Sequence, residues 1–200
     1  MTISTDRLAT VVQDAIGLIA IAVVVAAVHL VAPESLQQRL AFDHGQVRGY
    51  ALLTAAYVHA SDAHLLQNLQ GYLRIVGFPY IFSLVSHKRR WFWQTTLALL
   101  FVLPVLTSVT SYVLLPILYP SVTPVTYGFS DLVAGFAGVL IAAVGQYIQT
   151  RYDDTTAWAV SIAAGLFVVA LIGLRLTGAA SAIVTGGIGL TGVLAGGWYL

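Results

Sequence analysis

Six long apolar runs limit what this 200-residue chain can fold into more than any other feature. They cover residues 11–31, 64–85, 91–115, 130–148, 155–174 and 179–200. A helix needs about 20 apolar residues to cross the hydrocarbon layer of a bilayer, and each run is about that long. Backbone groups in lipid must pair within their own segment, so each run is predicted to be a helix. The sequence therefore predicts an all-α membrane protein, with six transmembrane helices forming a single domain over residues 1–200.

The composition supports this class of fold and excludes several functions. Hydrophobic residues make up 58% of the chain and charged residues 8%, whereas soluble domains carry about 25% charged residues. A net charge of +1 gives no basis for a nucleic-acid partner. The absence of cysteine excludes disulfides, thiolate metal sites and a cysteine nucleophile. We therefore expect a lipid bilayer around the chain and no metal or other cofactor.

The orientation follows from the basic residues in the short connections between runs. They gather before the first run, between the second and third, and between the fourth and fifth: Arg7, Lys88, Arg89, Arg90 and Arg151. Cytoplasmic loops carry an excess of such residues, so both termini are predicted to be cytoplasmic. The longest connection, residues 32–63, then lies outside. It mixes apolar and charged residues, which predicts a segment lying in the membrane interface.

Two polar motifs stand at the outer ends of apolar runs. The stretch LLTAAYVHASDAHLLQNLQG, residues 52–71, places His64 and Asn68 four residues apart, on one face of a helix. The stretch YGFSD, residues 127–131, places Ser130 at the start of another apolar helix, just after a glycine turn. Polar groups at membrane depth are costly, so they usually have a partner or a function.

These motifs resemble those of the rhomboid intramembrane serine proteases. That family carries an L-T-x-x-F-x-H run, then H-x-x-x-N opening its second membrane helix and G-x-S-G opening its fourth. The resemblance extends over all six runs and implies that Ser130 is the nucleophile. It also implies that His64 and Asn68, with the Ser130 backbone N–H, would stabilise the oxyanion. His59 belongs to the same motif region.

The chain departs from the family pattern at the catalytic base. The family carries a histidine in the motif H-x-x-G-x-x-x-G of its sixth helix, and Gly192 and Gly196 match the two glycines of that motif here. The expected base position is Gly189, and no histidine follows His87. Glycine cannot accept a proton, so the ordinary Ser–His dyad cannot form. Beside the serine, Asp131 stands where the family has a glycine that lets the fourth and sixth helices approach.

Other interpretations of these residues stay open. Serine is a preferred helix N-cap and an aspartate suits the first turn of a helix, so Ser130 and Asp131 also fit a structural role. A metal site at His59 and His64 is disfavoured because residues five apart do not share a helix face. Arg74 lies near the middle of the second run, where burial costs about 3 kcal/mol or more unless it is paired. It is predicted to pair with Asp131, or to reach carbonyl groups or water.

The sequence thus predicts a rhomboid-like membrane protein that lacks its dyad base. The first hypothesis is a pseudoprotease that binds transmembrane helices of other proteins. The second is an active serine endopeptidase in which His64 or Asp131 assists Ser130. The third is a small transporter or channel with Arg74 and Asp131 along its path. The glycines of the last run, together with Gly135 and Gly138, predict close packing of the fourth and sixth helices.

Overall fold

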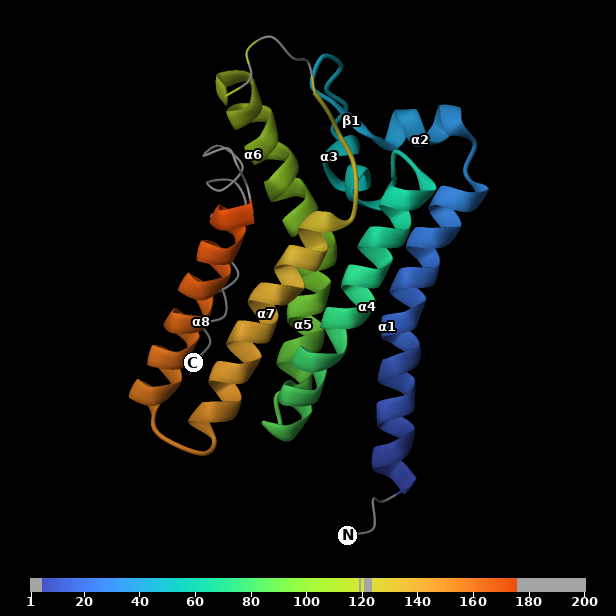
Figure 1. The fold of residues 1–200 in the computed structure, drawn as a ribbon. Helices are drawn as coiled ribbons and strands as arrows, with labels where there is room; N and C mark the ends of the chain where they lie inside the picture. The colour runs from blue at the N-terminus through green and yellow to red at the C-terminus, as the bar shows by residue number, and fades with distance from the viewer. Residues whose placement is uncertain (1–4, 119, 121–123, 176–200) are drawn as a thin grey trace.

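A computed structural model describes residues 5–118, 120 and 124–175 of the chain. Long helices dominate this part and lie side by side as a bundle (Figure 1). They are α1 (Thr5–Val31), α4 (Asp62–Val85), α5 (Arg89–Phe101), α6 (Leu103–Leu118), α7 (Ser130–Gln149) and α8 (Asp154–Arg175). Short elements fill the long connection: α2 (Glu34–Leu40), strand β1 (Phe42–Asp43), α3 (Ala51–Thr54) and the 3-10 helix η1 (Ala55–Tyr57). Strand β2 (Val125–Thr126) precedes α7.

The all-α prediction is confirmed for the described residues, and the first five apolar runs are helical. The third run is divided: α5 ends at Phe101 and α6 begins at Leu103, just before Pro104, whose ring cannot continue a regular helix. α6 also extends to Leu118, past the predicted end at residue 115. The sixth run, residues 179–200, lies outside the described residues. A bundle of six spans is therefore not established.

Within the part of the chain that the structure describes, three helical stretches are long and apolar enough to cross a membrane: Arg7–Val31, Arg89–Ile117 and Ser130–Gln149. α8 contributes a shorter apolar helix, Asp154–Val168. These lengths and compositions are those of a membrane protein. α4 is not among the three, since polar residues interrupt its sequence, yet it runs alongside α1 and α7 for the same length (Figure 1).

The core of the bundle lies where α4 crosses α7. Tyr72 of α4 is fully buried, and its ring lies edge-on to the rings of Phe129 and Phe136, with centroids 5.6 and 5.3 Å away. The Tyr72 hydroxyl donates to the carbonyl of Leu18 on α1, at 2.9 Å. A buried tyrosine usually finds such an acceptor, so this contact fixes α1 against α4.

Small residues allow the close approach of neighbouring helices. A Cβ on Gly71 of α4 would lie 3.1 Å from Val133 of α7. A Cβ on Gly135 would lie 2.8 Å from the side chains of both Leu99 and Leu103. Gly135 therefore faces α5 and α6, and its expected packing against the sixth helix stays a prediction. The other glycine of that expectation, Gly138, is buried, and the glycines of the last run lie outside the described residues.

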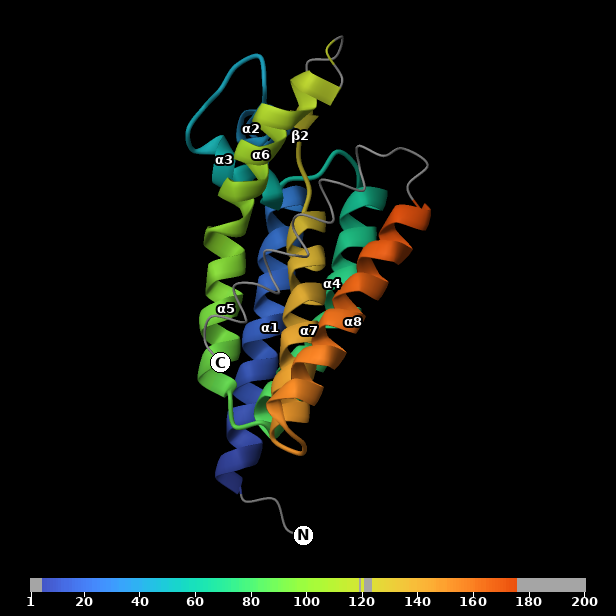
Figure 2. The same cartoon turned by 90° about the vertical axis from the view of Figure 1, so that its left-hand side faces the viewer.

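The short elements gather at one end of the bundle (Figure 2). Strand β1 pairs antiparallel with β2, with Phe42 opposite Thr126 and Asp43 opposite Val125. Phe42 is fully buried, and His44 Nε2 lies 3.1 Å from the Thr126 hydroxyl. The predicted interfacial segment is thus an ordered layer of short elements. Its β pairing holds the strand that leads into α7.

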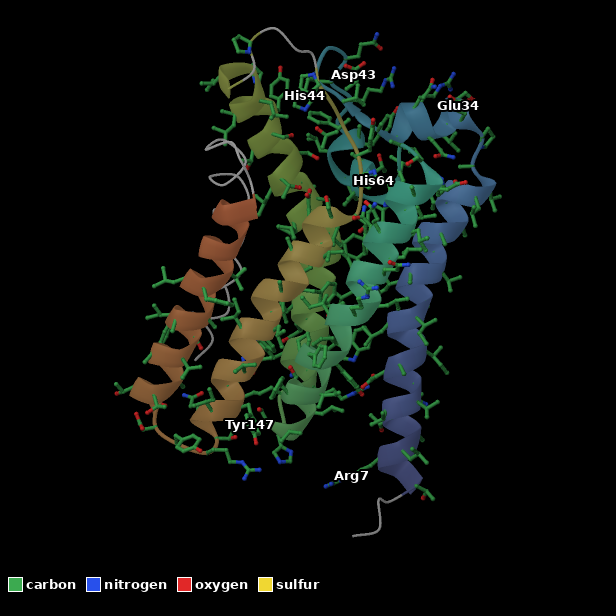
Figure 3. All side chains as sticks on the ribbon, viewed as in Figure 1. Arg7, Glu34, Asp43, His44, His64 and Tyr147 are labelled. Carbon is green, nitrogen blue, oxygen red and sulfur yellow. The ribbon has the colours of Figure 1, made fainter. Side chains whose placement is uncertain are left out.

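The opposite end carries a buried ion pair. Asp14 of α1 is 3% exposed, and its carboxylate accepts hydrogen bonds from Arg89, Tyr80 and Trp93. The start of α1 and the turns at residues 86–88 and 150–153 lie at this end, far from α2 and β1 (Figure 1). The positions of Arg7 and Tyr147 mark it in Figure 3. Sequence reasoning did not anticipate the Asp14 network.

Candidate functional site

The first turn of α4 positions His64 and Asn68. Ser61 is the N-cap of α4, and its hydroxyl accepts a hydrogen bond from the His64 backbone N–H at 3.2 Å. Asp62 follows in the first turn, where a carboxylate favours the positive end of the helix dipole. This cap fixes where the helix begins, and hence which face His64 and Asn68 share. That shared face is directed at the chain leading into α7.

Gly128 is the residue that α4 meets there. A Cβ on Gly128 would lie 2.7 Å from Cε1 and 2.8 Å from Nε2 of His64, and 3.4 Å from Nδ2 of Asn68. Its φ of +116° also favours glycine. The Gly128 N–H donates to the carbonyl of Ala55 at 3.0 Å. The predicted pair, His64 and Asn68, is therefore in contact with the backbone two residues before Ser130, as Figure 3 shows for His64.

Ser130 is exposed and is the first residue of α7. It does not cap the helix: the N-cap is Phe129, without a side-chain capping hydrogen bond, so the interpretation of Ser130 as an N-cap is wrong. The hydroxyls of Ser130 and Thr107 lie within hydrogen-bonding reach of the Asp131 carboxyl group. All five histidines lie in the described part of the chain, and none is hydrogen-bonded to Ser130 there.

Three histidines form a row beside this site. The rings of His59 and His64 have centroids 5.2 Å apart, and those of His29 and His59 are 6.0 Å apart. His29 Nε2 lies 2.9 Å from a carboxylate oxygen of the exposed Asp62. Within the described residues no group of three or more histidine, aspartate or glutamate side chains could hold a metal ion. The disfavoured metal site is thus not formed by them.

The His59 side chain contacts the backbone just before Ser130. It is 5% exposed, and its Nε2 accepts a hydrogen bond from the Phe129 N–H at 3.4 Å. Burial, together with the neighbouring His64 and His29 rings, lowers the pKa of His59 to about 4. At neutral pH the ring is therefore uncharged, with its proton on Nδ1. This tautomer leaves Nε2 free to accept from the backbone.

Asn68 carries a buried donor that no described residue satisfies. The side chain is 8% exposed, and its Nδ2 has no hydrogen-bond partner among the described residues. Leaving a buried amide unpaired costs about 1–3 kcal/mol, so such a group usually has a role. Nδ2 lies beside Gly128 and can donate to an anionic oxygen near the start of α7. The arrangement thus places an unpaired amide donor beside the chain that leads to Ser130.

Arg74, a predicted site residue, is not part of this arrangement. Arg74 is exposed, and it makes no ion pair with a described residue. Asp131 lies beside Thr107 and Ser130 instead, so the expected pairing of Arg74 with Asp131 is wrong. Gly189, the expected base position, lies outside the described residues.

Sequence reasoning missed Gly128 as a contact of His64, and Thr107 as a neighbour of Asp131. Gly128 carried a signal, since a glycine two residues before the serine permits the positive φ that the turn adopts. Thr107 carried none, because its contact arises only when α6 is placed beside α7. His29 belongs to a histidine row that no local pattern indicates.

Comparisons with known proteins do not identify a family. No family model matches the chain, and no curated protein or solved structure matches it at a significant level.

Proposed function

We propose that this protein is a rhomboid-like membrane protein that binds transmembrane helices of other proteins without cleaving them. The observation that carries the proposal is the contact of His64 and Asn68 with Gly128, two residues before the exposed Ser130. Segments that lie some 60 residues apart in the sequence meet there. Polar groups gathered at the outer end of a bundle can recognise the exposed backbone of a helix end.

The lack of a base for Ser130 supports binding rather than cleavage. A serine hydroxyl needs a neighbouring base to take its proton during attack on a carbonyl. The group within reach of Ser130 is the carboxyl group of its neighbour, Asp131, and no histidine is hydrogen-bonded to it in the described part of the chain. General-base assistance contributes about 100- to 10,000-fold to rate. Loss of the whole serine–base unit costs more.

Both termini are proposed to be cytoplasmic. The start of α1 and the two turns that carry Lys88 and Arg151 lie at one end of the bundle (Figure 1). Arg7, at the start of α1, lies at the same end (Figure 3). Basic residues gathered on one side support a cytoplasmic location for that side. The site around Ser130 would then open near the outer surface.

The test uses purified protein in lipid vesicles with fluorescently labelled transmembrane helices. Binding is followed by energy transfer and cleavage by gel electrophoresis. We expect saturable binding without fragments, and unchanged binding for Ser130→Ala. Asn68→Leu is expected to weaken binding, with Leu66→Ala on the exposed side of α4 as the matched control. Absence of saturable binding to any helix tested would refute the proposal.

An active serine endopeptidase with an unusual base is the second candidate. It is favoured by the presence of imidazoles next to the chain that leads to Ser130. His59 is a poor base for this purpose, because its Nε2 already accepts from Phe129 and its pKa is about 4. His64 is then the remaining imidazole, and Asp131 is the other candidate base. Cleavage abolished by both Ser130→Ala and His64→Ala would support this candidate, whereas fragments independent of Ser130 would exclude it.

The third hypothesis, a transporter or channel, has no observation in its favour. It required Arg74 and Asp131 along one path, and the described residues do not bring them together.

A further inference from the structure

The outer face of α4 carries a polar stripe that the described residues leave exposed. Gln67, Gln70 and Arg74 are all exposed and follow one another at intervals of three and four residues, so they share a helix face. The buried residues of α4, including Leu65, Tyr72 and Val76, lie on the opposite face, against α1 and α7. The stripe is therefore directed away from the core of the described bundle.

Arg74 lies at the middle of this helix. It is 12 residues from Asp62 and 11 from Val85, so about 17 Å of helix extends on either side. The exposed neighbours of the stripe toward the Val85 end are apolar: Phe78, Ile81 and Val85. In a membrane, a guanidinium in this place is far from water on both sides, and such a charge is costly without a partner.

This chain has no carboxylate to offer Arg74. The sequence holds eight acidic residues, the last of them Asp154, so no acidic residue occurs in residues 155–200. Asp14 is bound by Arg89, and Asp131 lies beside Thr107 and Ser130. The other six lie at or beyond the ends of the long helices: Asp6, Glu34, Asp43, Asp62, Asp153 and Asp154. The negative charge that complements Arg74 therefore has to come from another molecule.

We propose that the polar stripe of α4 binds a partner transmembrane helix that carries an aspartate or glutamate near its middle. Its carboxylate pairs with Arg74, through the two parallel hydrogen bonds that a guanidinium can donate to a carboxylate. Gln67 and Gln70 hydrogen-bond polar groups of the same helix nearer the outer surface. The inference rests on the proposed function and specifies the chemistry of the bound helix.

The test compares three synthetic leucine–alanine transmembrane helices that differ at one central position, which is aspartate, asparagine or leucine. Each is titrated against the full-length protein in vesicles of neutral phosphatidylcholine, and binding is measured by energy transfer. Wild-type protein should bind the aspartate helix about tenfold or more tightly than the leucine helix. Arg74→Leu should abolish this preference, Arg74→Lys should keep much of it, and Leu73→Ala is the matched control. A circular dichroism spectrum of each variant verifies its fold.

Charge reversal makes the test specific. Arg74→Glu should lose the preference for the aspartate helix and gain one for a helix with a central lysine. Equal binding of all helices by wild-type protein and Arg74→Leu would refute this inference and leave the proposed function standing. Failure of every helix to bind would refute the proposed function as well. The inference about Arg74 would also be refuted if residue 74 cross-linked to a second copy or to residues 176–200. Binding that depends on anionic lipid would refute this inference too.

Discussion

Removal of the Asp14 carboxylate is expected to destabilise the bundle by about 3–5 kcal/mol. Asp14 is 3% exposed and accepts four hydrogen bonds from three side chains of α4 and α5. Two come from Arg89, at 2.6 Å each, one from the Tyr80 hydroxyl at 2.7 Å and one from the Trp93 ring N–H at 3.0 Å. This carboxylate thus ties α1 to two other helices.

The magnitude follows from the groups that Asp14→Ala leaves behind. Each of the Tyr80 and Trp93 donors would lose its acceptor, at about 1–3 kcal/mol. The Arg89 side chain is 46% exposed and can regain water, so its contribution is discounted toward that of a surface pair. The sum agrees with the loss of about 3–5 kcal/mol that follows removal of one partner of a buried ion pair. Because Arg89 is partly exposed, we expect a loss near the lower end of this range.

The assay is detergent-induced or thermal unfolding, followed by circular dichroism. Arg90→Ala is the matched control for Arg89→Ala, since Arg90 is exposed and makes no ion pair with a described residue. It should change stability by no more than about 0.5 kcal/mol. A double-mutant cycle of Asp14→Ala and Arg89→Ala isolates their coupling. Additive effects, or an Asp14→Ala protein as stable as wild type, would refute the reasoning.

Three further perturbations test the site. Gly128→Ala adds a Cβ 2.7 Å from the His64 ring at a φ of +116°, so the bundle should lose about 1–3 kcal/mol of stability. Gly49→Ala is the control, because Gly49 has open space around it, and it should leave the stability unchanged in the same melting assay. The pKa of His59, lowered to about 4 from 6.5, means that the unfolded chain binds its proton first as pH falls. Stability should therefore decline from about pH 6.5 to pH 4, by at most about 3 kcal/mol, and this slope should flatten in His59→Asn; an identical slope would contradict the assignment. Gly189→His should give Ser130-dependent cleavage if the last run places residue 189 beside the serine. Cleavage is measured as fragments of a labelled helix. Fragments that persist when Ser130→Ala is added to Gly189→His would contradict this prediction.

The helices and one half of the site could be read from local patterns. Apolar runs of membrane length predicted both ends of α4, α7 and α8 to within two residues, because the bilayer requires helices wherever the chain crosses it. They also predicted the end of α1, which begins at Thr5, six residues before the predicted start. The spacing of His64 and Asn68 fixed their common face, because a helix has a known period. The absence of any histidine after His87 was also visible directly.

The remaining features depend on contacts between segments far apart in the chain. The third run is divided at Val102, close to Pro104. The contact of Leu99 and Leu103 with Gly135 joins segments more than 30 residues apart, so no local pattern could predict it. The pairing of Arg74 with Asp131 failed because helix rotation and depth, which the sequence does not specify, separate the two side chains. The Asp14 network was missed for the same reason.

The sequence alone determined that the described chain is built from membrane-length helices, and which polar side chains share a helix face. Hydrophobic length and helical period are local properties, so they need no knowledge of neighbours. The tertiary structure decided that His64 and Asn68 contact Gly128, that Asp14 is held by Arg89, and that Arg74 remains exposed. These outcomes depend on the rotation and depth of each helix in the bundle, which the packing of all the helices sets together.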